Sequence, residues 1–334
     1  MLISQNSCAA LSKYIDSGER KIFCSSLYLS AKWMVISQVV KKGLHIVVLP
    51  DKESAEYCCS DLYSFVDGDN VFFLPESGKN IERSNYKSSL AVQRTSALSR
   101  ILSGEENLTI IVTYSSALSE NIPSGNTISS DRMIIKRGDE ISHDSLSEKL
   151  YEKGFEKVDF VSEPGQYAIR GSIIDIFSFS NNYPYRISLW GDEIEKINTF
   201  DCNTQLSKDD VSEVEIISEV LSSPEEEGDC LLSMLDRNTV LWLDSSDIYS
   251  QEQWFKNWSE SFVRVFLDIP PSFDKGELSV KFQISPQPKF NKNFELLTED
   301  IRSRIENSYK VLIYSEKESQ LDRIKSILSQ NGGL

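Results

Sequence analysis

The chain has 334 residues, of which 40% are hydrophobic and 26% are charged, and its formal net charge is −16 at pH 7. A chain of this length and composition is expected to form two or three domains, each with its own core. The longest apolar runs, at 46–49 and 240–243, are no longer than single strands, so we expect no membrane span. The first residues do not follow the pattern of a signal peptide, and we therefore expect a cytoplasmic protein.

Charge and cysteine content exclude further classes. The net charge is −1 over residues 1–120, −8 over 121–217 and −7 over 218–334. A surface that binds DNA phosphates is expected to be basic, so we do not expect this chain to bind DNA by itself. The six cysteines are scattered and the chain has only two histidines, so we predict reduced thiols and no metal site.

Residues 1–120 alternate between short apolar runs and amphipathic runs. The predicted strands are 21–26, 45–50, 71–76 and 108–114, and the predicted helices between them are 30–42, 53–66 and 88–102. Continuous apolar strands separated by helices are typical of a parallel sheet that is covered on both faces. This part resembles a RecA-like nucleotide-binding domain of the P-loop type.

The pattern changes after a polar linker at 119–131. Residues 132–217, which we call the middle domain, predict one helix at 145–153 and several strands, with Gly191-Asp192 as a two-residue hairpin turn. This part is predicted to be α+β with an antiparallel sheet.

The α/β alternation returns after residue 218. The predicted strands are 240–244, 263–268, 279–284 and 310–315, and the predicted helices are 252–262, 293–309 and 316–330. The simplest architecture is therefore one α/β domain built from both chain ends, 1–120 and 218–334, with the middle domain inserted.

Residues 24–32, CSSLYLSAK, occupy the place of a phosphate-binding loop between a predicted strand and a predicted helix. A working loop of the form G-x-x-x-x-G-K-[ST] has two glycines and a hydroxyl after the lysine. Here Lys32 remains, but Ser26 and Ala31 stand at the glycine positions and Trp33 stands at the hydroxyl position. We predict that this degenerate loop cannot easily take positive φ, and that the fold binds no nucleotide or other cofactor.

Two charged residues near this loop have a functional and a structural interpretation. Lys32 is either a phosphate ligand or, as we prefer, a surface lysine at a helix N-terminus. Asp244 ends the apolar run VLWLD, as a Mg²⁺-binding acid would, but Ser245 follows where a second acid is expected. We therefore interpret residues 244–247 as a helix N-cap.

The predicted strand 185–190 carries the clearest binding signal. Alternation along a strand puts Tyr185, Ile187 and Leu189 on one face, and Arg186, Ser188 and Trp190 on the other. Arginine and tryptophan are enriched at binding hot spots, and Arg170 is expected on a neighbouring strand. The alternative is that Trp190 packs beneath a loop and that Arg186 pairs with a nearby acid. Periodicity alone leaves both interpretations open.

The segments SEPGQYAIRGSIIDIF (162–177) and YPYRISLWGDEIEKINTFDCNTQLS (183–207) closely resemble the UvrB-homology module of bacterial transcription-repair coupling factors. The segments LSAK (29–32) and PQPKFNKNFELL (286–297) extend the resemblance. It implies domains like 1a, 2 and 1b of UvrB over 1–120, 132–217 and 218–334. The lack of a working phosphate loop, and of a long aromatic hairpin after 108–114, favours this family over UvrB itself.

The resemblance implies a non-catalytic module that recruits UvrA to stalled RNA polymerase, while other domains of the same protein act on DNA with ATP. It assigns the UvrA contact to Arg170, Arg186 and Trp190; the family usually has Phe and Asp where this chain has Trp190 and Gly191. Two other hypotheses remain: a nucleotide-dependent enzyme with an atypical loop, and a DNA-binding module, which the acidic charge disfavours.

Overall fold

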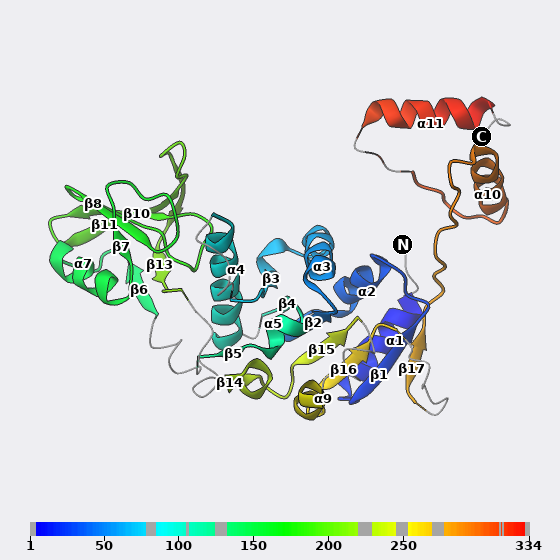
Figure 1. Ribbon diagram of the computed structural model, residues 1–334, viewed down its shortest axis with the longest axis horizontal. Helices are drawn as coiled ribbons and strands as arrows, with labels where there is room; N and C mark the ends of the chain where they lie inside the picture. Colours follow the sequence, from blue (N-terminus) through cyan, green and yellow to red (C-terminus); the bar gives the residue numbers. More distant parts are fainter. Residues whose placement is uncertain are drawn as a thin grey trace. The chain divides into compact units, whose positions relative to one another are not determined.

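The computed structural model describes residues 5–77, 85–104, 107–123, 132–219, 229–244, 253–268, 277–313, 315 and 317–330. The chain divides into two compact units, Met1–Ile284 and Ser285–Leu334. The first unit contains a parallel sheet and an antiparallel sheet, and the second contains two helices (Figure 1). No helix in the described residues is long and apolar enough to cross a membrane.

The parallel sheet has seven strands in the order β17-β1-β16-β15-β2-β4-β3. Its strands are β1 (Lys21–Ser25), β2 (Leu44–Leu49), β3 (Val71–Phe73), β4 (Thr109–Tyr114), β15 (Val240–Leu243), β16 (Val263–Phe266) and β17 (Ser279–Lys281). Because β15 lies between β2 and β16, and β1 lies between β16 and β17, strands from before and after the middle domain share one sheet. The predicted α/β class is confirmed.

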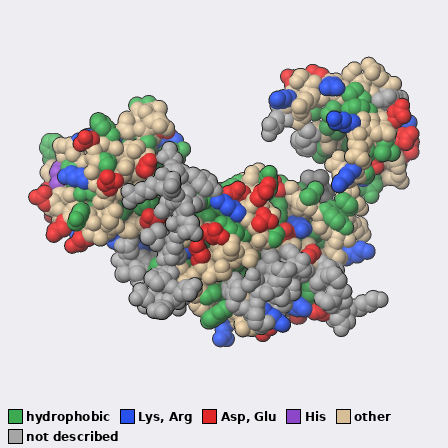
Figure 2. Space-filling view, in the orientation of Figure 1, with side chains coloured by type: hydrophobic (Ala, Val, Ile, Leu, Met, Phe, Trp, Pro, Cys, Tyr) green, Lys and Arg blue, Asp and Glu red, His purple; other side chains and the backbone are tan. Residues whose placement is uncertain are grey.

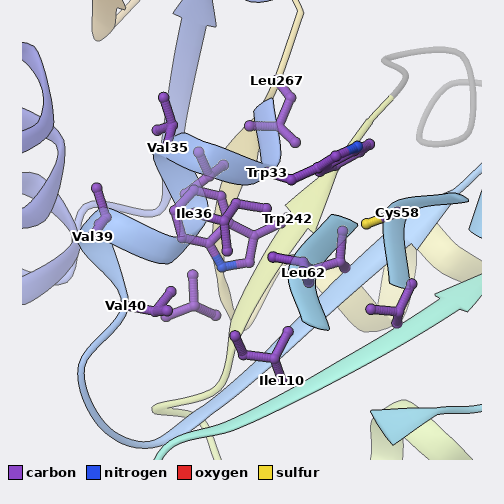
Figure 3. Close-up of a cluster of buried hydrophobic side chains, with 14 of the residues drawn as sticks. Trp33, Val35, Ile36, Val39, Val40, Cys58, Leu62, Ile110, Trp242 and Leu267 are labelled. Carbon is purple, nitrogen blue, oxygen red and sulfur yellow. The ribbon is translucent and has the colours of Figure 1, made fainter. Parts of the chain in front are cut away.

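Both faces of this sheet are covered, which explains why its strands are apolar at nearly every position. Helices α1 (Gln5–Asp16), α2 (Ala31–Val39) and α3 (Lys52–Phe65) pack on one face, and α4 (Asn85–Leu102) and α9 (Gln253–Ser259) contribute to the core on the other. Figure 3 shows Trp242 of β15 beneath α2, with Ile36 and Leu62 around it. The fully buried indole of Trp242 thus joins a late strand to the early helices.

The middle domain has a six-stranded sheet in the order β12-β11-β10-β9-β8-β7, antiparallel except for the pair β7 and β8. Its elements are β6 (Met133–Lys136), α7 (His143–Glu152), β7 (Glu156–Lys157), β8 (Gln166–Arg170), β9 (Ile173–Ile176), β10 (Tyr185–Trp190), β11 (Glu193–Phe200), β12 (Ser207–Val211) and β13 (Glu213–Ile216). Leu146 and Leu150 of α7 pack against the sheet face that carries Ile187. The separate antiparallel sheet is as predicted.

Two short features support the middle domain. Trp190 pairs with Glu193 across Gly191 and Asp192, and Gly191 has a φ of 65°, as the first position of a type II′ turn requires. The predicted two-residue hairpin is therefore confirmed. At the base of the insertion, β5 (Asn121–Ile122) pairs antiparallel with β14 (Asp229–Cys230), so the chain leaves and rejoins the α/β part at one place.

The second unit contains α10 (Phe294–Glu306) and α11 (Glu318–Gln330). Both helices were predicted, and the Asn293 side chain caps α10 by accepting from the Leu296 N–H at 3.0 Å. The strand predicted at 310–315 is wrong for its described residues, 310–313 and 315, which form no strand. An apolar run becomes a strand only beside another strand, and the described residues of this unit offer none.

His45 of β2 is a buried histidine at the contact between two strands. Its Nδ1 accepts a hydrogen bond from the Trp242 Nε1–H at 3.2 Å, and its Nε2 lies 3.1 Å from the Lys42 carbonyl oxygen. These partners suit a neutral ring that is protonated at Nε2. Burial lowers the pKa of His45 to about 4.

We expect acid to destabilise the α/β part through this ring. Between pH 7.5 and pH 5 the unfolded chain binds a proton at His45 and the native state does not, so the native state loses about 2 kcal/mol of its stability. Urea unfolding at the two pH values measures this loss. In His45→Gln, the loss of stability between pH 7.5 and pH 5 is expected to be about 2 kcal/mol smaller than in the unmodified chain. In the control His143→Gln, the loss is expected to be the same as in the unmodified chain. An equally large loss in His45→Gln would contradict the assignment to His45.

Candidate functional site

The degenerate loop keeps a left-handed backbone without glycine. Ser26, at the first glycine position, has a φ of 58°, and Leu29 has a φ of 49°. The prediction that this loop avoids positive φ is therefore wrong. A left-handed residue other than glycine costs roughly 1–2 kcal/mol. Packing of β1 and α2 into the core on either side of the loop is sufficient to offset that cost.

Lys32 is part of an ion pair in the interior of the α/β part. Its Nζ lies 2.5 Å from Oδ1 of Asp244, and the two side chains are 18% and 17% exposed. The predicted place of Lys32 at a helix N-terminus is confirmed, but its side chain is mostly buried instead of lying on the surface. Parallel strands end at the same edge of a sheet, so the residues after β1 and after β15 meet there although 212 positions separate them. Of the predicted N-cap, residues 245–247 lie outside the described residues.

The other two loop positions also lack nucleotide chemistry. Trp33, which stands where a Mg²⁺-binding hydroxyl is needed, is 7% exposed and packs in the core near Leu267 (Figure 3). Ala31 begins α2 and brings no polar side chain. Lysine and aspartate therefore neutralise each other at the place where phosphate and Mg²⁺ bind in a working loop.

We expect Lys32→Ala to lower the free energy of unfolding by about 1–2 kcal/mol, because it leaves the mostly buried Asp244 carboxylate without its cation. Urea denaturation measures this, with Lys13→Ala on the exposed side of α1 as the control. Calorimetric titration with MgATP is expected to show no saturable heat in either protein. Saturable binding that Lys32→Ala abolishes would contradict this interpretation.

The outer face of the middle-domain sheet holds the second group of predicted residues. Burial alternates along β10: Tyr185, Ile187 and Leu189 are buried, and the residues between them are less so. Trp190 is 79% exposed, so it does not pack beneath a loop. The alternation predicted for this strand is confirmed.

Arg186 is held firmly within this face. Its Nε and Nη2 donate to Oδ1 and Oδ2 of Asp175 at 2.8 and 2.9 Å, and its Nη1 and Nη2 donate to the backbone oxygen and Oε1 of Gln205 at 3.1 and 3.0 Å. Its guanidinium lies 4.2 Å from the centre of the Phe200 ring. The hydrogen bonds with Asp175 raise the pKa of Arg186. The alternative that the sequence left open for Arg186, pairing with a nearby acid, is therefore what the structure shows, and the acid is Asp175.

Arg170 reaches the same carboxylate from β8. Its Nη2 pairs with Oδ2 of Asp175, and its guanidinium lies 4.6 Å from the centre of the exposed Phe160 ring. The Arg170 side chain is 35% exposed, about twice the 18% of Arg186. Arg170 and Arg186 thus meet at Asp175, while Trp190 stands at the hairpin end of the same strand as Arg186.

Asp175 is the residue that the sequence analysis missed. It lies within the apolar run IIDIF, and its side chain is 1% exposed. Burying a carboxylate without a nearby cation costs free energy. An aspartate in the middle of an apolar strand could therefore have indicated that a cation pairs with it. The register that puts Asp175 opposite Arg186 was not readable from the sequence.

This face carries side chains of the kinds that are enriched at protein interfaces. It combines guanidinium donors with exposed apolar surface at Trp190, Phe160 and Leu206. Acidic side chains are frequent on the surface beside α7 (Figure 2). Among the described residues, no three His, Cys, Asp or Glu side chains are grouped as metal ligands.

Comparison with known proteins gives two kinds of match. Residues 133–220, which span β6 to β13, match the family model of the UvrB interaction domain. The chain is also similar to proteins named transcription-repair-coupling factor. It is 31% identical over 177 residues to that of Bacillus subtilis, 26% over 186 to that of Haemophilus influenzae and 28% over 202 to that of a Staphylococcus aureus strain.

The similarity covers 52%, 55% and 60% of this chain, respectively. It covers only 15%, 16% and 17% of the relatives, so the chain spans about one sixth of the length of the curated relatives it matches. The resemblance seen in the sequence is confirmed: residues 133–220 match the model of the UvrB interaction domain, and the chain resembles part of a transcription-repair-coupling factor.

Proposed function

We propose that this chain is a non-catalytic recruitment module of a transcription-repair coupling factor and that it binds UvrA. The contact is made by the outer face of the middle-domain sheet, through Arg170, Arg186 and Trp190. The observation that carries the proposal is the exposure of Trp190 at the end of the strand that carries Arg186, one of two arginines that share one buried carboxylate.

The chemistry of this face supports a protein partner. An exposed indole has a large apolar area to place in a pocket, and the N–H groups of Arg170 can bond to carboxylate or carbonyl oxygens. The net charge of −8 over 121–217 opposes binding to nucleic acid and leaves the arginines as local cationic points. A partner surface with acidic groups around an apolar pocket fits this arrangement.

The α/β part serves as the scaffold in this proposal. We interpret it as a degenerate RecA-like domain, with 1–120 and 218–334 corresponding to domains 1a and 1b of UvrB and 132–217 to domain 2. The Lys32–Asp244 ion pair supports the loss of nucleotide chemistry. In the cytoplasm, other domains of the full protein would act on DNA with ATP and reach RNA polymerase, so this chain supplies recruitment alone.

We expect Arg170→Glu and Trp190→Ala each to weaken binding to UvrA of the same organism by about 30-fold, or about 2 kcal/mol, because each removes a central contact of the interface. Calorimetry or surface plasmon resonance measures the affinity, and circular dichroism verifies the fold.

Two control variants match these changes in chemistry. Arg137→Glu alters another exposed arginine of the middle domain, and Trp258→Ala removes a tryptophan that is 46% exposed on α9. Both are expected to bind UvrA as the unmodified chain does. Equal affinity of all four variants and the unmodified chain would refute the proposed site.

A further inference from the structure

We infer that Asp175 is a positioning residue of the interface: it holds the guanidiniums of Arg170 and Arg186 in place and does not touch the partner. This inference rests on the proposed function, and it concerns a residue outside the predicted contact set. Asp175 is too deeply buried for a partner to reach, since its side chain is 1% exposed.

The carboxylate connects three strands of the sheet. In the register, Asp175 of β9 stands opposite Arg186 of β10 and Ala168 of β8, on the face away from α7. Its Oδ1 accepts from Nε of Arg186, and its Oδ2 accepts from Nη2 of both Arg186 and Arg170. The two parallel bonds to Arg186 fix the plane of that guanidinium, and the shared oxygen places Arg170 beside it.

Aromatic rings restrict the same two groups from a second direction. The Arg186 guanidinium lies over Phe200, and the Arg170 guanidinium lies over Phe160. A flexible arginine side chain on a protein surface loses considerable rotamer entropy when a binding partner orders it. Here the carboxylate and the rings order both arginines before the partner arrives, which is the general source of affinity through preorganisation.

The two arginines do not play the same part. A guanidinium has five N–H donors. Arg186 uses four of them, two on Asp175 and two on Gln205. Arg170 has one hydrogen bond among the described residues, to Asp175. Arg170 therefore offers most of the donors to a partner, while Arg186 mainly maintains the geometry.

The charge balance of this cluster also points to the kind of group it receives. One carboxylate between two guanidiniums leaves one positive charge in excess. The free donors of Arg170 and this excess charge suit a carboxylate of the partner. Neutralising Asp175 keeps both cations but removes what orients them, so we expect weaker binding in spite of the greater positive charge.

A double-mutant cycle on UvrA affinity tests the inference. We expect Asp175→Asn to weaken binding about 10-fold. Combined with Arg170→Ala, it is expected to cost at least threefold less than the product of the two single losses, because Asp175 acts through Arg170. If Asp175 had a purely structural role, the loss of affinity in the double variant would equal the product of the losses in the two single variants. That result would overturn the inference.

Asp210→Asn is the matched control. Asp210 lies on the same row and face of the sheet, through Asn198, and it pairs with Arg137 and Lys196 instead of the two site arginines. It is expected to leave affinity within about twofold of the unmodified chain. A loss as large as that of Asp175→Asn would show that any acid on this face has the effect, and would also overturn the inference.

A measurement on the unmodified chain decides the question if Asp175→Asn does not fold. In an NMR spectrum of arginine Nε–H groups, the Arg186 signal is expected to exchange slowly with water, since this N–H is bonded to Asp175, and the Arg170 signal is expected to exchange fast. Equal exchange rates would reject the positioning role. Normal binding of UvrA by Arg170→Ala would refute the proposed function. If Arg170→Ala weakens binding but the losses of the two single variants multiply in the double variant, only the positioning role of Asp175 is refuted.

Discussion

The sharing of one parallel sheet by strands from both sides of the middle domain is the constraint on which the α/β part depends. β15 runs between β2 and β16, and the indole of Trp242 fills the space beneath α2. Neither half of the sheet can bury its apolar strands alone. The middle domain is therefore an insertion whose two ends meet at the short pair of β5 and β14. This arrangement lets the inserted sheet present an exposed face without disturbing the core of the parallel sheet.

Both candidate sites contain a cation on a carboxylate, with opposite consequences. In the loop at 24–32, Lys32 and Asp244 form a single pair at less than 20% exposure, so the two charges offset each other. On the inserted sheet, Asp175 serves two arginines, so charge and donors remain at the surface beside Trp190.

The sequence predicted the element types well, because apolar periodicity is a local property. It predicted the faces of β10 correctly, as well as the hairpin turn at Gly191. It failed where neighbours decide the outcome. The backbone at Ser26 takes positive φ since the elements on either side are packed, and residues 310–313 form no strand because they lack a partner strand. Lys32 is mostly buried because the segments that follow β1 and β15 meet at one edge of the sheet, where Asp244 pairs with it.

Local alternation and residue type were enough to identify an α/β chain with an inserted sheet and an outward tryptophan at 190. Only the tertiary structure decided that Asp175 joins Arg170 to Arg186 and that Asp244 receives Lys32. The reason is physical. Which side chains meet depends on the order and register of strands, and these are set by burial summed over the whole sheet, across as many as 256 positions of sequence.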